Sequence, residues 1–217
     1  MSGPYNPLDK MNLGRSVAEA LLLSPVAPLQ NVADLPGAGV YAIYYSGTFE
    51  PYLPVATKNQ NGIFAQPIYV GKAAPKGARK GGLAFDASKG RALRDRLRQH
   101  AASIDEANNL NLADFCFRSL VVDDIWIPLG ENMMIEQFKP IWNLVIDGFG
   151  NKDPGMRRST QYRSSWDVLH PGRQFADKLA AGEMRTSILV ARLRDFFAGR
   201  DVPLVPDAGT TEQDDQD

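Results

Sequence analysis

The 217-residue sequence is poor in the side chains that form disulfides and metal clusters. A single cysteine, Cys116, excludes an internal disulfide, and two histidines are too few for a zinc cluster. No apolar run is long enough to cross a bilayer, and the N-terminus lacks the basic and then apolar segments of a signal peptide. We therefore expect a cytoplasmic protein, and a hydrophobic fraction of 44% is ordinary for one with a packed core.

The sequence also lacks an excess of either charge that would by itself indicate a partner. With 24 basic and 25 acidic residues, the formal net charge is −1. The basic residues are nevertheless concentrated between Lys72 and Arg98 and again between Lys152 and Arg173. Segregated charge of this kind can give a neutral protein a positive cleft, although the same residues can equally form the solvated faces of helices and loops.

Two short segments with the composition of strands carry a tyrosine each. Residues 40–45 (VYAIYY) and 67–72 (PIYVGK) are rich in β-branched and aromatic residues and are bounded by turn-forming residues. A polar excursion over 47–66 separates them, and we expect the two strands to be antiparallel neighbours. Because both runs are almost continuously apolar, alternation does not show which way Tyr41 and Tyr69 point.

Two predicted helices direct polar side chains toward the sheet. Residues 91–104 form an amphipathic helix on which Arg96 and His100, one turn apart, lie along one edge of the apolar stripe. Residues 131–139 form another, on which Glu131 projects from the apolar face. A buried carboxylate needs a cation or hydrogen-bond partners, so Glu131 is a candidate metal ligand. The alternative for Glu131 is that it interacts with the helix dipole. The alternative for Arg96 and His100 is that they lie at the boundary of the core.

A third strand over 115–122 completes the predicted fold. The fold class is α+β: a small three-stranded antiparallel sheet flanked by helices, with further helices over 12–23 and 187–197. Asn143 lies in an otherwise apolar run (IWNLVI), where its amide needs partners from the structure or from the surroundings of a metal site.

Taken in order, these residues resemble the GIY-YIG nuclease superfamily. The matching residues are Gly39-Val40-Tyr41, Tyr69-Val70-Gly71, Arg96 with His100, Glu131, and Asn143. Each piece is common by itself, but the ordered set over residues 37–146 is much more specific. The Arg-then-His pair, the YVGKA wording and the long insertions are similar to the type II restriction-endonuclease branch, particularly the enzymes of SacII-type specificity. Valine replaces the usual isoleucine in both motifs, which removes no functional group.

The resemblance implies one nuclease domain with additions at both ends. The expected parts are a domain over 1–206 with a GIY-YIG-like core at 37–146, an N-terminal helical extension (1–36), a C-terminal DNA-contacting loop and helix (147–206), and an acidic disordered tail (207–217). The implied reaction is hydrolysis of double-stranded DNA with one Mg²⁺ ion per active site, for which Mn²⁺ can substitute.

The resemblance also implies roles for the residues around the phosphate. Arg96 would bind the scissile phosphate and stabilise its developing charge, because a guanidinium is always protonated. Glu131 would hold the Mg²⁺ ion, with water and phosphate oxygens completing its coordination. Tyr69 would position the phosphate or the other tyrosine, and Asn143 would orient the site.

The group that accepts the proton of the attacking water stays open. Tyr41 is one candidate, but a phenol with a pKa near 10 is a poor base at pH 7 unless neighbouring charges lower that pKa. His100 and Lys72 are the other two candidates.

DNA recognition is expected from the segments 47–66, 73–90 and 150–173. The candidate DNA-binding residues are Lys76, Arg79, Lys80, Arg157, Arg158 and Arg163. Arginine pairs well with guanine, which favours a G·C-rich palindrome, and a two-fold target favours a homodimer on DNA. A cognate DNA methyltransferase is expected in the host. The alternatives are a homing or repair-type nuclease of the same superfamily and a non-catalytic DNA-binding module of the same fold.

Overall fold

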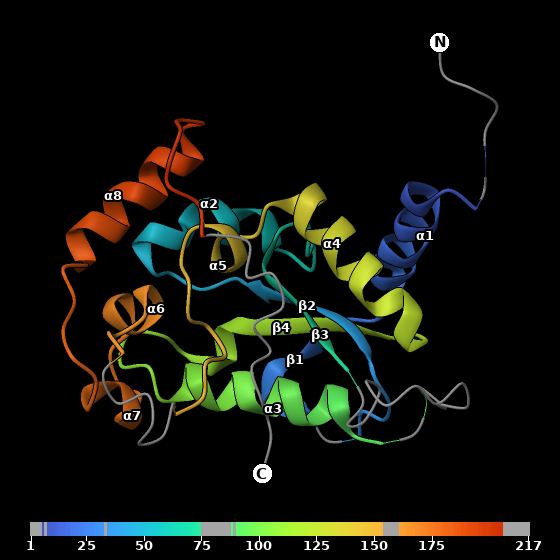
Figure 1. The fold of residues 1–217 in the computed structure, drawn as a ribbon, viewed down its shortest axis with the longest axis horizontal. Coiled ribbons are helices and arrows are strands. Elements are labelled where there is room, and N and C mark those ends of the chain that lie inside the picture. The colour runs from blue at the N-terminus through green and yellow to red at the C-terminus, as the bar shows by residue number, and fades with distance from the viewer. Residues whose placement is uncertain are drawn as a thin grey trace.

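One antiparallel sheet lies at the centre of the protein. The computed structural model (Figure 1) describes residues 6, 8–32, 34–74, 88, 90–153 and 161–205. The strands are β1 (Ala27–Pro28), β2 (Gly39–Tyr45), β3 (Pro67–Ala73) and β4 (Phe115–Val121), in the spatial order β1-β4-β2-β3. Strand β2 pairs with β3 on one side and with β4 on the other, both antiparallel, which confirms the predicted pairing of the two tyrosine-bearing strands.

The prediction of three strands is wrong. The sheet has four, because the two residues of β1 pair with Phe117 and Cys116 on the outer side of β4. A two-residue strand that includes Pro28 has neither the length nor the alternation by which a strand is found in a sequence. Proline is tolerated at this position because β1 is an edge strand.

Helices cover both faces of the sheet, and alternate residues of β2 point to opposite faces. The odd-numbered residues of β2, Tyr41 among them, belong to the larger core together with side chains of α3 (Ala92–Asp105). The even-numbered residues, Val40 among them, belong to a smaller core with α1 (Lys10–Leu23) and α4 (Ile127–Phe138). In Figure 1, α3 lies below the strands and α1 and α4 lie above them. All of β2 is buried, which is why its sequence shows no alternation.

Local signals set the ends of the helices. Asp9 caps α1, and its side chain accepts a hydrogen bond from the Met11 amide at 2.8 Å. Helix α4 begins at Ile127 rather than at Glu131 as predicted, with Pro128 in its first turn, where a missing amide hydrogen is tolerated. Glu131 therefore lies beyond the first turn, where the helix dipole has little effect on a carboxylate.

The excursion between β2 and β3 folds into short helical turns. It contains the 3₁₀ turns η2 (Glu50–Tyr52) and η3 (Thr57–Asn59) on either side of α2 (Leu53–Ala56). Asn59 closes it at its base: its Nδ2 donates to the carbonyls of Tyr45 at 2.9 Å and Gln66 at 2.8 Å, and its Oδ1 accepts from the Gln66 amide at 2.9 Å. The buried amide thus joins the end of β2 to the residue before β3.

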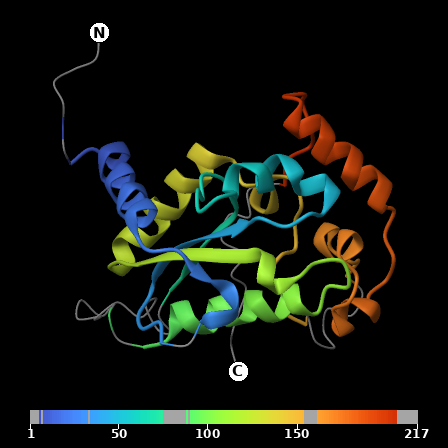
Figure 2. The ribbon, with the colours of Figure 1, turned by 180° about the vertical axis from the view of Figure 1, so that it is seen from behind.

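The C-terminal part of the chain packs into the larger core. Its helices are α5 (Ile141–Leu144), α6 (Ser165–Leu169), α7 (Gln174–Asp177) and α8 (Thr186–Phe197). Trp166 of α6 and Leu189 and Leu193 of α8 are fully buried in the same core as Tyr41. Figure 2 shows α8 and α6 from behind, on the side of the molecule opposite to α1. Short 3₁₀ turns precede β2, β4 and α4: η1 (Leu29–Asn31), η5 (Leu112–Asp114) and η6 (Asp124–Trp126).

Several predicted features fall outside the described residues. These are the acidic tail over 207–217 and most of the basic loop over 73–90. Across the part of the chain that the structure describes, no helix is long and apolar enough to cross a membrane.

Candidate active site

The two tyrosine-bearing strands meet at a glycine. Tyr41 of β2 lies opposite Gly71 of β3 in the register of the sheet. A Cβ atom at Gly71 would overlap the hydroxyl of Tyr41 and the ring of Tyr69. A Cβ atom at Gly39 would similarly overlap the carbonyl oxygen of Leu120 on β4. The glycines of both motifs are therefore needed for space, and the one in β3 leaves room for the hydroxyl of Tyr41.

Tyr41 is hydrogen-bonded to the histidine of α3. Its hydroxyl lies 2.6 Å from Nε2 of His100, and both side chains are fully buried. Burial raises the pKa of Tyr41 well above 10, and the neighbouring Tyr69 raises it further against the opposing effect of Arg96. Burial also lowers the pKa of His100 well below 6.5, and the positive charge of Arg96 adds to this effect. At neutral pH the pair is therefore an uncharged phenol beside an uncharged imidazole.

The guanidinium of Arg96 lies near the hydroxyls of both tyrosines. Its positive charge opposes the rise in pKa that burial causes at Tyr41 and at Tyr69, which places it within electrostatic reach of the two hydroxyls. Its Nη1 donates to Oε1 of Gln99 at 2.7 Å and to the carbonyl oxygen of Gly150 at 3.4 Å. Arg96 thus brings a permanent positive charge to the tyrosine hydroxyls.

Tyr69 completes this group of four side chains. Its ring lies edge-on to His100 with centroids 5.1 Å apart, and its centroid is 6.2 Å from that of Tyr41. Burial raises the pKa of Tyr69, whereas Arg96 lowers it. We call Tyr41, Tyr69, Arg96 and His100 the tyrosine cluster.

A carboxylate and an ammonium group lie beside the tyrosine cluster. Nζ of Lys72, on β3, is 2.9 Å from Oε2 of Glu131, on α4. Both side chains keep some access to solvent, with exposed fractions of 23% and 15%. The negative charge of Glu131 raises the pKa of Tyr41 and of Tyr69, which places the carboxylate within electrostatic reach of both hydroxyls.

The donor set around Glu131 fits Mg²⁺ but not a metal held by the protein alone. Among the described residues, no group of three or more His, Cys, Asp or Glu side chains could hold a metal ion. Mg²⁺ commonly binds through one carboxylate and completes its coordination with water and substrate phosphates. The ammonium group of Lys72 already places one positive charge against this carboxylate.

Asn143 holds the open edge of β3. Its Oδ1 accepts a hydrogen bond from the Val70 amide at 2.9 Å, and its Nδ2 donates to the Val70 carbonyl at 2.8 Å. Val70 lies between Tyr69 and Gly71, so this amide of α5 fixes the strand at the point where it carries the site. Asn143 contacts the backbone and acts on the tyrosine cluster through it.

The structure describes one of the six predicted DNA-binding residues. Lys76, Arg79, Lys80, Arg157 and Arg158 lie outside the described residues. Arg163 is described, and its guanidinium donates to the carbonyls of Ala176 at 2.9 Å and Asp177 at 3.2 Å, next to α7.

The segment 150–173, predicted to read DNA, is partly core. Trp166, His170 and Arg173 have exposed fractions of 0%, 0% and 1%. A buried Arg173 cannot contact DNA in this conformation. It forms an ion pair with Asp167, six residues earlier in the chain, and no sequence pattern predicts this pairing. Sequence reasoning likewise missed Phe149, whose ring stacks on His100 with centroids 4.5 Å apart.

The fold and the tyrosine cluster define a nuclease of the GIY-YIG class. A model of the Eco29kI GIY-YIG domain, a family of restriction endonucleases, matches residues 33–196. Because this match covers most of the chain, the protein belongs to that family and is a restriction-type nuclease that acts on DNA. A search of curated proteins gave no match.

Proposed function

We propose that the protein is a type II restriction endonuclease that hydrolyses phosphodiester bonds of double-stranded DNA at a G·C-rich palindrome. The observation that carries the proposal is the tyrosine cluster, in which a neutral imidazole is hydrogen-bonded to the Tyr41 hydroxyl and a guanidinium lies within electrostatic reach of the hydroxyls of both tyrosines. Hydrolysis needs a stabiliser for the charge that develops on the phosphate and an acceptor for the proton of the attacking water. The cluster contains both kinds of group, with the Lys72–Glu131 pair beside it.

Arg96 is the group that binds the scissile phosphate. It carries a charge at every physiological pH, and that charge lies within electrostatic reach of the hydroxyls of Tyr41 and Tyr69. Because the site is largely buried, this charge is weakly screened and acts strongly on the transition state. Lysine at this position would keep the charge but lose the planar set of donors.

Tyr41 and His100 transfer the proton together. The phenol is uncharged, so Tyr41 can take the proton of the attacking water only by releasing its own. Nε2 of His100, 2.6 Å away and uncharged, accepts that proton when it is the unprotonated nitrogen of the ring. The water oxygen then bonds to phosphorus as the bond from phosphorus to the 3′-oxygen breaks, and solvent water protonates the leaving oxygen.

Lys72 remains the second candidate for the base. Its Nζ lies 2.9 Å from Oε2 of Glu131, and this contact engages the nitrogen with the carboxylate. The ion pair therefore favours Tyr41 with His100 over Lys72.

Glu131 is the residue that would hold the metal, one Mg²⁺ ion or Mn²⁺ in its place. When bound there, the ion supplies a positive charge to the phosphate oxygens and the leaving group. In its absence the ammonium group of Lys72 neutralises the carboxylate.

A single tyrosine cluster cuts one strand, so cutting both strands of a palindrome calls for a homodimer on DNA. A matching methyltransferase would protect host DNA. Mixing wild-type protein with a Glu131→Gln variant tests the dimer, because mixed dimers nick circular DNA once. If the variant only dilutes the wild-type activity and no nicked circles accumulate, the dimer is excluded.

The function is tested by incubating the protein with G·C-rich plasmids and Mg²⁺, beside Glu131→Gln and a sample with EDTA. We expect discrete fragments from wild type with metal and at least about a hundredfold slower cleavage by the variant, because charge stabilisation at the phosphate is lost. The matched control is Glu136→Gln, on the same helix. Undiminished cleavage by Glu131→Gln would exclude the metal site, and DNA binding without cleavage in any lane would favour a non-catalytic binder.

A further inference from the structure

Residues 148–151 lie against the tyrosine cluster, although they belong to neither motif. The ring of Phe149 stacks on the imidazole of His100, with centroids 4.5 Å apart and planes inclined by 16°. The same ring lies edge-on to Tyr69 at 4.9 Å and packs on Trp142 at 4.3 Å. Phe149 thus packs against Trp142 of the core and against Tyr69 and His100 of the cluster.

Gly150 makes the next contact. Its carbonyl oxygen accepts a hydrogen bond from Nη1 of Arg96 at 3.4 Å. Its φ of +77° lies in the left-handed region, and a Cβ atom there would lie 3.0 Å from Nδ1 of His100 and 3.3 Å from Nη2 of Arg96. Glycine therefore allows the backbone to approach both side chains, which a larger residue would displace.

A buried ion pair fixes this segment. Nε of Arg173 lies 2.7 Å from Oδ1 of Asp167, and the side chains are 1% and 2% exposed. The other two nitrogens of the guanidinium donate to the carbonyls of Gly148 and Asn151, each at 3.1 Å. One side chain thus holds both ends of the segment 148–151. Because a buried ion pair is stable only when its geometry and hydrogen bonds are satisfied, the segment is held rigidly.

His100 depends on packing for its orientation. Within the part of the chain that the structure describes, its Nδ1 is buried and has no hydrogen-bond partner. In His170, by contrast, Nε2 is bonded to the hydroxyl of Tyr52 at 2.6 Å and Nδ1 to Asn109 at 2.8 Å. A histidine that works with a second group is usually oriented through its other nitrogen. No described residue supplies that partner for His100, and the stacked ring of Phe149 constrains the imidazole instead.

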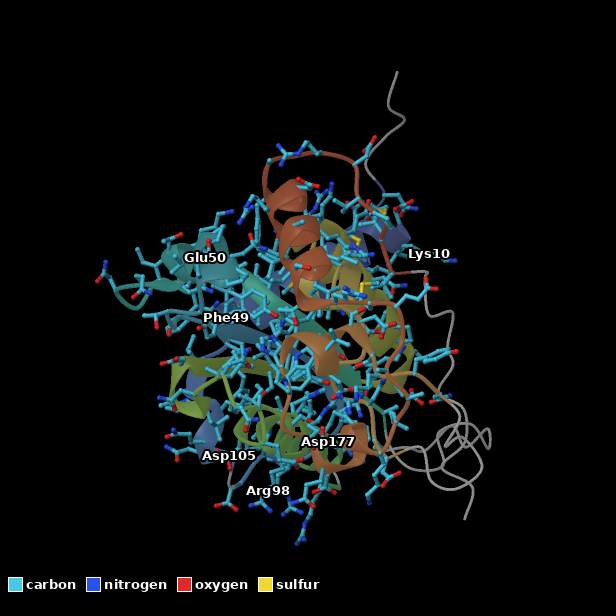
Figure 3. All side chains as sticks on the ribbon, turned by 90° about the vertical axis from the view of Figure 1, so that its left-hand side faces the viewer. Lys10, Phe49, Glu50, Arg98, Asp105 and Asp177 are labelled. Atoms are coloured by element: carbon cyan, nitrogen blue, oxygen red, sulfur yellow. The ribbon has the colours of Figure 1, made fainter. Side chains whose placement is uncertain are left out.

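We propose that residues 148–151, held by the Asp167–Arg173 ion pair, form a positioning element of the active site. Phe149 sets the plane of His100 so that Nε2 faces the hydroxyl of Tyr41, and the Gly150 carbonyl sets the direction of Arg96. The kinetic consequence rests on the proposed nuclease function, whereas the orientation of His100 does not. In Figure 3, Asp177 marks the end of α7, the helix that follows Arg173, and Asp105 marks the end of α3, the helix that carries His100.

The kinetic test compares Phe149→Leu with Phe115→Leu. Both residues are buried aromatic side chains that contact Trp142, but the ring contacts of Phe115 are with Tyr45 and Trp142 and not with His100. We expect Phe149→Leu to lower the single-turnover cleavage rate at saturating DNA by about tenfold or more, with unchanged DNA affinity, because a misplaced proton acceptor slows only the chemical step. Equal loss of rate in the two variants would overturn the proposal.

The orientation of His100 is measured directly by nuclear magnetic resonance. The chain has two histidines, so ¹⁵N-histidine labelling gives two ring systems, with His170 as the internal reference. In Phe149→Leu we expect the Nε2 signal of His100 to leave its hydrogen-bonded position, while His170 and the Phe115→Leu spectrum stay as in wild type. An unchanged Nε2 signal would overturn the positioning role, even if the cleavage rate falls.

These measurements also separate the two proposals. Wild-type protein that cuts no DNA with Mg²⁺ or Mn²⁺ would overturn the nuclease function. The histidine spectra would then still decide whether Phe149 orients His100, since they need neither DNA nor metal.

Discussion

At the scale of single residues, the site is built by very close approaches. Tyr41 can lie over β3 only because residue 71 has no side chain. His100 can be buried beside Arg96 only as an uncharged ring, and its pKa is accordingly held well below 6.5. The first approach requires that residue 71 has no Cβ atom, and the second requires that His100 is uncharged. We therefore expect small substitutions at these positions to have large effects.

Gly71→Ala tests this sensitivity. The added methyl group would overlap the Tyr41 hydroxyl and push it away from His100. We expect at least about a tenfold loss of cleavage rate from the misaligned pair, with a fold that remains cooperative. The matched control is Gly182→Ala, whose Cβ would make only ordinary contacts with Tyr162, from 3.4 Å. Cleavage assays beside thermal melts separate the two effects, and full activity in Gly71→Ala would show that this close contact is not needed.

At the scale of elements, the site depends on β3 being held at both edges. One edge pairs with β2, and the other is held at Val70 by the two hydrogen bonds from Asn143. Because β3 carries Tyr69 and Lys72, restraint of both of its edges fixes the positions of these two side chains in the site.

Asn143→Leu removes that restraint. The Val70 amide and carbonyl would lose their partners in a half-buried position, which we expect to cost about 1–3 kcal/mol of unfolding free energy. The same change should reduce cleavage, because Tyr69 is the neighbour of Val70. Urea denaturation gives the first quantity, and a midpoint unchanged from wild type would mean that solvent replaces the amide at no cost.

The sequence predicts some of these elements better than others. Helix α3 has a clear apolar stripe, and β2 and β3 are rich in β-branched and aromatic residues, so the positions of all three follow from spacing and composition. The spacing also places His100 at the edge of that stripe. Strand β1 has only two residues, and Pro128 hides the start of α4. The contacts of Phe149 with His100, and of Arg173 with residues 148–151, join positions that no local pattern relates. Such contacts follow from the packing of the whole chain.

At the scale of the whole molecule, two buried histidines make stability depend on pH. Burial, with a smaller effect of Arg173, lowers the pKa of His170 from 6.5 to about 3, and His100 shifts in the same direction. Below the unfolded pKa the unfolded chain takes up protons that the folded protein does not. The stability contributed by the neutral rings is thus complete above about pH 6.5 and is lost as the pH falls toward the folded values.

This loss of stability on acidification is measurable as a change in the free energy of unfolding with pH. Between pH 7 and pH 5, we expect His170 alone to reduce the free energy of unfolding by about 2 kcal/mol. Urea denaturation at the two pH values measures the difference, and in His170→Gln the difference should shrink because one titrating ring is gone. A stability that rises on acidification over this range would contradict the buried, neutral state of both histidines.

The ion pair between Asp167 and Arg173 has a consequence for engineering. The residues that carry the nuclease motifs end at Asn143, and this suggests a compact module that could be fused to another DNA-reading domain. Yet the ring that stacks on His100 comes from Phe149, and the guanidinium that anchors its segment comes from position 173. A fusion protein truncated just after the motifs would contain every reactive group but would lack Phe149, the ring that packs against His100. A portable unit therefore has to extend at least through Arg173.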